Sequence, residues 1–179
     1  MTTSMTGSGP ELTLDLLVLD DATELLEFET YNREFFARSV GPRPEGYFEI
    51  DSLREILREL LAGPDSETDR LYLARNAEHQ IVGRANLTNI GVTRPGHGMV
   101  GYRVGENFCG GGVATRALAM LLDRVGQDHG VTEVEALVAV TNPASKSVLV
   151  HNGFIQLPGI QPVAFNGEDI VLERFLRTL

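Results

Sequence analysis

Hydrophobic residues recur along the chain at two spacings, one typical of helices and one typical of strands. Residues 53–61 and 114–125 place apolar side chains three or four positions apart, which predicts two helices that each bury one face. Strands are predicted where apolar residues alternate or run together, at 11–19, 71–75, 80–90, 99–104, 131–140, 154–157 and 170–176. This order predicts one α/β (α+β) domain, a mostly antiparallel sheet with helices on its faces.

Polar residues and a glycine-proline pair mark the ends of the predicted helices. Asp21 and Glu24 have the spacing of a capping box, which predicts a helix from there to about residue 28. Ser52 and Glu55 repeat this spacing before the helix at 53–61. Gly63, followed by a proline, is expected to end that helix.

Length and composition describe a globular protein of ordinary make-up. The chain has 179 residues, of which 42% are hydrophobic and 22% charged, so residues 11–179 are expected to form one domain. Residues 1–10 are small and polar and predict a flexible tail without the features of a signal peptide. No apolar run approaches the roughly 18 residues of a membrane span. Cys109 is the single cysteine, which excludes an internal disulfide or a cysteine-built zinc site and fits the cytoplasm; no metal is expected.

The net charge of the chain limits the classes of partner that it can bind. The formal net charge is −10, whereas proteins that bind nucleic acid present a basic face to the phosphates. Nucleic acid is therefore not expected as a partner, and neither is a membrane. An acidic protein attracts cationic molecules, so an amine is a suitable substrate.

Three consecutive glycines, Gly110, Gly111 and Gly112, lead directly into the helix predicted to begin at Ala114. The first turn of a helix has N–H groups without internal partners, and no Ser, Thr, Asp or Asn stands here to cap them. A bound phosphate satisfies such donors and suits the positive end of the helix dipole. A flexible turn hydrated by water is the alternative. No Lys-Ser or Lys-Thr pair follows the glycines, which argues against a P-loop.

Four motifs in order resemble the GNAT N-acetyltransferase superfamily, and within it the branch that acetylates the N-termini of ribosomal proteins. Residues 109–114, Cys-Gly-Gly-Gly-Val-Ala, are similar to the family's coenzyme-A loop Gln/Arg-x-x-Gly-x-Gly/Ala, with Cys109 in the Gln/Arg place. The segment Asn-Pro-Ala-Ser at 142–145, followed by Asn-Gly-Phe at 152–154, resembles the branch's Asn-x-x-Ser and Gly-Phe motifs. Residues 32–36 and 165–172 resemble its segments after the first helix and near the end. The resemblance implies a splayed sheet that binds acetyl-CoA.

The resemblance also implies the reaction and its residues. It implies direct transfer of an acetyl group to a primary amine, either a protein N-terminal α-amine or a small cationic amine. The residues implied to contact coenzyme A are Val104, Gly105, Cys109, Gly110, Gly111, Gly112, Val113, Ala114, Thr115 and Asn142. Gly105 is alternatively a turn or bulge glycine. Asn142 is alternatively the N-cap of a short helix that starts with a proline and ends before residue 153, and it can serve both roles.

Ser145 is the implied catalytic residue. The branch places a serine here to face the sulfur, where its hydroxyl stabilises the leaving thiolate and passes on a proton. A local hydrogen bond within the first helical turn is the alternative. A backbone N–H near Val104 is the implied donor to the oxyanion.

The base is where the chain departs from the branch. Met99 stands where the branch commonly has a glutamate, and a methionine cannot accept a proton. One alternative is that no base is needed, because an α-amine has a pKa of about 7.7–8.0. Another is His97, which otherwise is an exposed loop histidine. Three carboxylates can attract a cationic amine or else lie on the surface, namely Glu29, Glu34 and Asp169.

Cys109 and Tyr102 have further interpretations, and so do the function and the oligomeric state. Cys109 at a helix N-terminus can have a lowered pKa and act as a nucleophile, but no histidine lies nearby in the sequence. Tyr102 is expected in the core, on the opposite face from Met99. The competing hypothesis for function is a coenzyme-A-binding module without catalysis, which acts as a sensor or partner-binding subunit. A homodimer through the C-terminal strands is compatible with the sequence.

Overall fold

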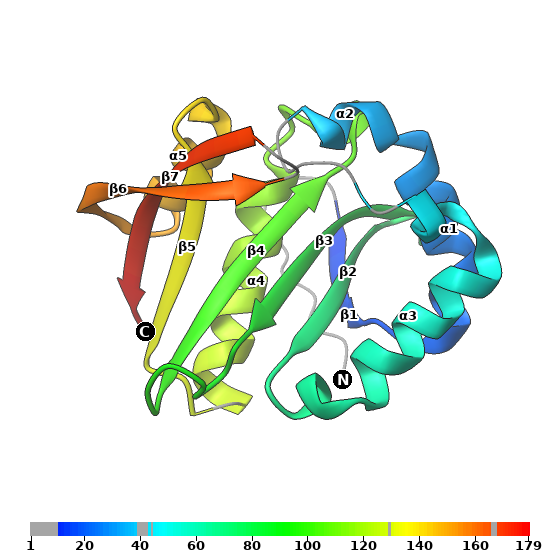
Figure 1. Cartoon of the computed structure of the whole chain (residues 1–179), viewed down its shortest axis with the longest axis horizontal. Helices are drawn as coiled ribbons and strands as arrows, with labels where there is room; N and C mark the ends of the chain where they lie inside the picture. The colour runs from blue at the N-terminus through cyan, green and yellow to red at the C-terminus, as the bar shows by residue number, and fades with distance from the viewer. Residues whose placement is uncertain (1–10, 39–42, 44, 129, 166–167) are drawn as a thin grey trace.

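The computed structural model describes residues 11–38, 43, 45–128, 130–165 and 168–179. Its strands are β1 (Leu12–Leu16), β2 (Arg70–Asn76), β3 (Ile81–Thr88), β4 (His97–Val104), β5 (Glu133–Ala139), β6 (Ile155–Phe165) and β7 (Glu168–Thr178). Its α-helices are α1 (Ala22–Tyr31), α2 (Arg33–Ala37), α3 (Ile50–Ala62), α4 (Val113–Asp128) and α5 (Pro143–His151). The strands form one seven-stranded sheet in the order β1-β2-β3-β4-β5-β7-β6 (Figure 1). Neighbouring strands are antiparallel except β4 and β5, which confirms the predicted fold class.

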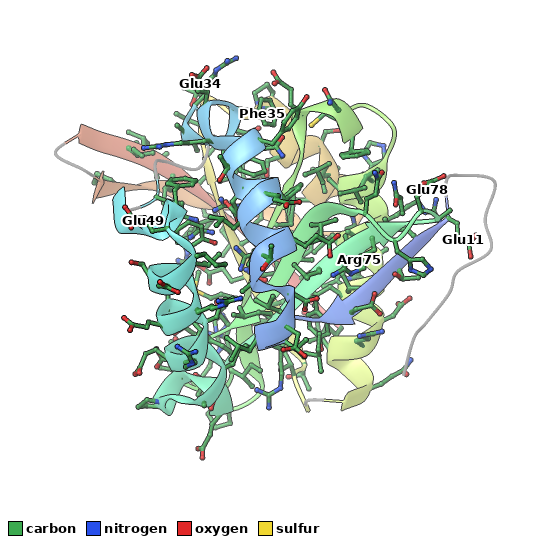
Figure 2. The ribbon with its side chains drawn as sticks, turned by 90° about the vertical axis from the view of Figure 1, so that its right-hand side faces the viewer. Glu11, Glu34, Phe35, Glu49, Arg75 and Glu78 are labelled. Atoms are coloured by element: carbon green, nitrogen blue, oxygen red, sulfur yellow. The ribbon has the colours of Figure 1, made fainter. Side chains whose placement is uncertain are left out.

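Helices cover both faces of the sheet and bury two separate apolar clusters. Helix α4 packs on one face through Leu118 and Leu121, which no solvent reaches. Helices α1 and α3 cover the other face, where Leu25 and Leu53 pack against the leucines of β2. Figure 2 shows these two helices side by side over the sheet. Strand β2 contributes Tyr72 and Ala74 to the first cluster and Leu71 and Leu73 to the second, because successive side chains of a strand point to opposite faces.

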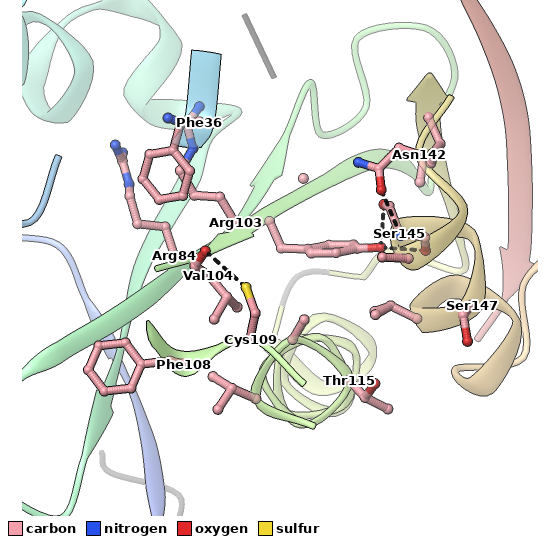
Figure 3. A pocket seen from close by; sticks show the side chains of 18 of the residues that line it. Phe36, Arg84, Arg103, Val104, Phe108, Cys109, Thr115, Asn142, Ser145 and Ser147 are labelled. Carbon is pink, nitrogen blue, oxygen red and sulfur yellow. Dashed lines mark hydrogen bonds between the residues drawn. The ribbon is translucent and has the colours of Figure 1, made fainter. Parts of the chain in front are cut away.

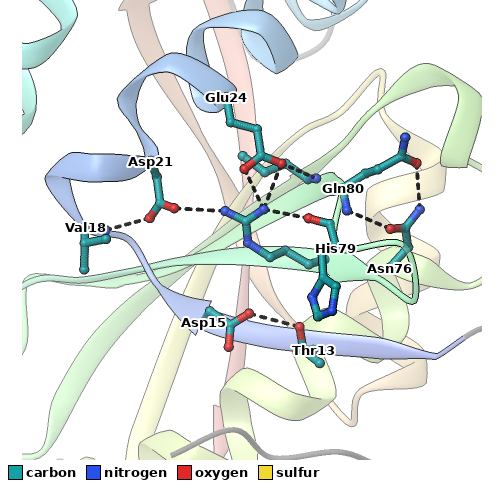
Figure 4. Close-up of polar contacts among 10 residues, drawn as sticks. Thr13, Asp15, Val18, Asp21, Glu24, Asn76, His79 and Gln80 are labelled. Atoms are coloured by element: carbon teal, nitrogen blue, oxygen red, sulfur yellow. Dashed lines mark hydrogen bonds and ion pairs between the residues drawn. The ribbon is translucent and has the colours of Figure 1, made fainter.

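Helix α1 begins directly after Asp21, as predicted, but the predicted capping bond of Asp21 does not form, and the predicted start of α3 is wrong. Asp21 Oδ2 accepts a hydrogen bond from the Val18 N–H (2.9 Å), and Asp21 Oδ1 lies 2.9 Å from Arg75 Nη2 (Figure 4). Its carboxylate therefore joins the chain before α1 to strand β2 instead of capping α1. Helix α3 begins at Ile50, two residues before the predicted cap Ser52. Gly63 ends α3 as predicted.

The C-terminal strands are much longer than predicted. Strand β6 continues through Pro158 and Gly159, beyond the end predicted at residue 157. Both residues lie where the register shifts between Gln156 and Ile160, and β6 is the edge strand of the sheet. An edge strand tolerates proline because one side of it needs no ladder donors. The sequence Asn-Gly at 166–167 predicts a turn between the last two strands, and this position lies outside the described residues.

Within the described parts of the chain, no helix combines the length and the apolar character that crossing a membrane requires.

Candidate active site

The sheet opens between its two parallel strands. Pairing of β4 with β5 covers residues 97–99 and 133–135, and beyond it both strands line a pocket of about 780 Å³ (Figure 3). This volume suits a small molecule or cofactor, whose sites typically measure about 300–1,000 Å³. The lining residues are 84, 86, 100–104, 108–110, 112–115 and 136–139, together with 35, 36 and 38 near α2 and 142, 144, 145, 147 and 148 near α5.

The glycine loop forms one wall of this pocket and ends at the start of α4. Gly110 and Gly112 have φ angles of 80° and 77°, the left-handed region that glycine adopts without strain. A Cβ added at either position would meet nothing within 4 Å, so open space lies beside the backbone. The Arg116 N–H donates to the Gly112 carbonyl (3.0 Å), which leaves the N–H groups of residues 113–115 without helical partners. The loop thus has the geometry of an anion cradle.

Most residues predicted to contact the cofactor line this one pocket. They are Val104, Cys109, Gly110, Gly112, Val113, Ala114, Thr115 and Asn142, and Ser145 joins them. Gly105 and Gly111 are not among the lining residues. At Gly105 a Cβ would come within 3.1–3.2 Å of the Phe28 and Asn32 side chains, so close packing against α1 favours glycine here.

Asn142 caps helix α5, as its alternative interpretation predicted. Its Oδ1 accepts a hydrogen bond from the Ser145 N–H (3.0 Å). The same side chain lines the pocket, so capping places it and Ser145 next to each other at the cavity wall (Figure 3).

Tyr102 belongs to the site, which the sequence prediction missed. Its ring packs against the core on the α4 face, as expected, but its hydroxyl reaches the pocket. That hydroxyl donates to the Ser145 carbonyl (2.9 Å) and lies 2.8 Å from Ser145 Oγ, where either oxygen can donate. Burial raises the pKa of Tyr102 to about 12, despite the opposing hydrogen bond with Ser145. Two features could have indicated its role. Tyr102 lies on the strand that leads into the glycine loop, and a buried tyrosine needs a polar partner for its hydroxyl.

A buried ion cluster lies where α1 crosses β3 and β4. The Glu29 carboxylate, only 1% exposed, lies 2.8 Å from Arg84 Nη1, 3.1 Å from Arg103 Nη1 and 3.5 Å from Arg43 Nη2. Burial is the largest effect on Glu29 and would raise its pKa, but the charges of Arg103, Arg84 and Arg43 together lower it. Arg84 Nη1 also donates to the Tyr47 hydroxyl (3.2 Å). Glu29 is thus neither a surface carboxylate nor free to attract an amine.

The other proposed acid–base residues lie away from the pocket lining. His97 is 3% exposed within β4, so its expected exposure is wrong, and its Nε2 lies 3.7 Å from Glu135 Oε2. Neither His97 nor Met99 lines the pocket. Glu34 is exposed on α2 (Figure 2), and the side chain of Asp169 lies outside the described residues. Among the described lining residues, none is an aspartate, a glutamate or a histidine.

Cys109 lacks the features of an activated nucleophile. Burial, and secondly the charge of Glu106, raise the pKa of its thiol. Its Sγ donates to the Gly105 carbonyl (3.4 Å). No three His, Cys, Asp or Glu side chains of the described residues lie close enough together to hold a metal ion.

Comparison with known proteins decides the family. Residues 11–155 match the family described as Acetyltransferase (GNAT) domain. The chain belongs to this family. It is therefore an acyltransferase with acetyl-CoA as its donor, as the sequence resemblance implied. A Bacillus subtilis (strain 168) protein named Probable N-acetyltransferase YjcK is 23% identical over 139 residues, which are 77% of each chain.

Solved structures of GNAT proteins share the fold. Mycobacterium smegmatis RimJ in complex with CoA-disulfide has a TM-score of 0.87 at 21% identity, over 99% of this chain and 86% of that one. The ribosomal-protein-S5-alanine acetyltransferase of Vibrio fischeri has a TM-score of 0.86 at 20% identity, over 98% and 96%. Spermidine N-acetyltransferase from Vibrio cholerae, in complex with CoA and spermine, has a TM-score of 0.76 at 18% identity, over 93% and 95%. At these identities the likeness concerns the fold and does not choose an acceptor.

Proposed function

We propose that this GNAT protein transfers the acetyl group of acetyl-CoA directly to a primary amine that enters the pocket between β4 and β5. The observation that carries the proposal is one continuous pocket that joins the uncapped start of α4 to the Tyr102–Ser145 pair. An anion site and a pair of hydroxyl donors in one cavity suit a ligand that has phosphates at one end and a thioester at the other.

Binding of the cofactor follows from backbone groups more than from side chains. The N–H groups at the start of α4, with the open backbone at Gly110 and Gly112, would hold the pyrophosphate. The stretch of β4 beyond Met99 is no longer paired with β5, so its peptide groups are free to bond the pantetheine arm as a neighbouring strand would. Asn142 would add its amide at the same wall.

The hydroxyl pair would serve the leaving group. In the reaction the nitrogen of the neutral amine bonds the carbonyl carbon and loses a proton, the C–S bond breaks, and the sulfur takes up a proton. Ser145 Oγ would donate its proton to the developing thiolate while accepting the proton of the Tyr102 hydroxyl, which orients the serine. A backbone N–H of β4 would stabilise the oxyanion. The raised pKa of Tyr102 keeps its hydroxyl protonated, and therefore able to donate, at neutral pH.

The amine can enter without a dedicated base. Arg38 and Arg103 line the pocket, and their positive charges disfavour the ammonium form of a nearby amine, which lowers the pKa of that amine. A free α-amine already titrates at about 7.7–8.0, so a modest further decrease makes it mostly neutral at physiological pH. This accounts for catalysis with Met99 in place of a glutamate.

The acceptor class is tested by turnover. The fold relatives are named for acetylation of ribosomal proteins and of spermidine, which supports a protein N-terminal amine or a small amine as candidates. Release of free thiol from acetyl-CoA would be followed across N-terminal peptides, amino acids, polyamines and aminoglycosides, with acetyl-CoA binding measured by calorimetry. Turnover with an acceptor, reduced about 100-fold in Ser145→Ala, supports the proposal. Tight binding without turnover on this panel favours the non-catalytic module.

A further inference from the structure

The end of the pocket near α2 carries an excess of positive charge. Arg43, Arg84 and Arg103 share the single carboxylate of Glu29, so the cluster, which is buried except at Arg43, keeps a net charge of about +2. Arg84 and Arg103 line the pocket, and Arg38 adds a further guanidinium at its exposed mouth. No described lining residue supplies a carboxylate in return.

This excess charge is held in place and largely removed from water. Arg84 is 5% exposed, and its Nε has no hydrogen-bond partner among the described residues. Arg103 stacks over the Phe36 ring, with its Cζ 4.9 Å from the ring centroid. Burial is the main reason that the pKa of Arg103 falls to about 10, and the like charges of Arg43 and Arg84 lower it further. Buried charges in proteins are normally paired, so the pocket lacks an anion at this end.

The charged end is distinct from the proposed phosphate cradle. Arg84 and Arg103 are directly paired across β3 and β4 and contact Glu29 of α1, which places them on the α1 face of the sheet. The glycine loop leads into α4, which covers the opposite face. Figure 3 shows Arg84, Arg103 and Phe36 on one side of the pocket and Ser145 with Asn142 on the other. The arginines therefore lie apart from the phosphate cradle, where they can bind a group other than the pyrophosphate.

We propose that the acceptor is a primary amine that carries a carboxylate near its reacting nitrogen, bound by Arg38 and Arg103 with Arg84 behind them. This rests on the proposed function of the same pocket and narrows its acceptor. Guanidinium groups bind planar carboxylates through two parallel hydrogen bonds, which fixes the orientation of the amine. Such an acceptor completes the charge balance of the cluster, whereas a polyamine such as spermidine adds to the repulsion. The carboxylate belongs either to a free amino acid or to an acidic residue at the start of a peptide.

Matched acceptors test the carboxylate directly. Peptides that differ only by Asp or Asn at the second position, amino acids beside their amides, and spermidine would be compared by kcat/KM. Binding of the same compounds to the CoA-saturated protein would be measured by calorimetry. We expect the carboxylate member of one pair to exceed its amide by about 10- to 100-fold in both measurements, the range of a hydrogen bond to a charged group. The pair that shows the difference identifies peptide or amino acid as the source.

A variant and its control tie the effect to the arginines. Arg38→Gln removes an exposed lining charge and should reduce the carboxylate preference to less than about threefold, with CoA affinity unchanged. Arg33→Gln is the control, because Arg33 is exposed, stacks over Phe48 at 4.3 Å and does not line the pocket; it should keep the full preference.

The outcomes separate this inference from the proposed function. Amides or spermidine bound and acetylated as well as the carboxylates would overturn the inference and leave the acetyltransferase intact. The inference would also be overturned if Arg38→Gln kept the full carboxylate preference. It would be overturned as well if Arg38→Gln lost CoA affinity, because Arg38 would then bind the cofactor. Selective binding of carboxylates without turnover would support the recognition and refute the proposed catalysis.

Discussion

The hydroxyl of Tyr102 on strand β4 lies 2.8 Å from Ser145 Oγ in the first turn of α5. The two residues join the walls of the pocket at the point where the sheet has opened. Ser145 is itself placed by Asn142, which caps α5 through the Ser145 N–H. Three polar residues from two elements thus converge on one position, where a leaving sulfur would need a proton donor.

Replacing Ser145 by alanine should separate catalysis from binding. We expect kcat to fall by about 100-fold, the size of a lost proton donor, while calorimetric affinity for acetyl-CoA changes little. Ser52→Ala, on α3 and away from the pocket, is the control and should keep full activity. An equal loss of affinity and kcat/KM with unchanged kcat would instead make Ser145 a binding residue.

Replacing Tyr102 by phenylalanine should change how stability depends on pH. The folded pKa of about 12 is above the ordinary value of 10.0, so the folded protein holds this proton more tightly than the unfolded chain. The associated stability is complete below pH 10 and is lost as the pH rises through the folded pKa. Across that window the free energy of unfolding should fall by about 2–3 kcal/mol more in the natural protein than in Tyr102→Phe. Urea unfolding at several alkaline pH values measures this difference. If the free energy of unfolding of both proteins changed equally with pH, the raised pKa of Tyr102 would be refuted.

Replacing Gly112 by glutamate should abolish cofactor binding. The new side chain would meet a φ of 77°, project into the open space of the pocket and carry a negative charge toward a phosphate. We expect CoA affinity to fall by more than about 100-fold, a loss of about 2.7 kcal/mol or more. Gly111→Glu adds the same charge at the adjacent residue, which does not line the pocket, and should lower CoA affinity much less. Equal CoA affinities of the two folded variants would refute the phosphate-binding role of this loop.

Replacing Glu29 by glutamine should destabilise the fold. It leaves Arg84 and Arg103 buried beside each other without their shared counter-ion, which typically costs about 3–5 kcal/mol. Because the folded pKa of Glu29 is lowered from 4.5, its contribution is present above that value and is lost as the pH falls through the lower one. Glu34→Gln, on the exposed side of α2, is the control with almost no effect. Urea unfolding at pH 7 and pH 3 tests the loss of stability and its pH dependence. An unchanged free energy of unfolding in Glu29→Gln would show that the arginines are hydrated.

Local signals in the sequence predicted the glycine loop, the Asn142 cap and the end of α3. Each depends on residues within a few positions, such as a glycine at a positive φ or an amide before a proline. The family motifs supplied Ser145, and the structure places it in the pocket with the loop.

Features that depend on distant residues escaped prediction. Glu29 is separated by 55 residues from Arg84 and by 74 from Arg103, so only the folded sheet brings them together. His97 was predicted to lie in an exposed loop, but it lies in β4, and a Cβ at its neighbour Gly98 would come within 2.7 Å of Leu87 Cδ1. Packing on the neighbouring strand, not a turn, accounts for that glycine.

A crystal structure with bound acetyl-CoA tests the central claim most directly. We expect density between β4 and β5, with the pyrophosphate at the N–H groups of residues 113–115 and the sulfur beside Ser145 Oγ. Density for the acetyl-CoA outside this pocket, or a sulfur turned away from the Tyr102–Ser145 pair, would contradict it.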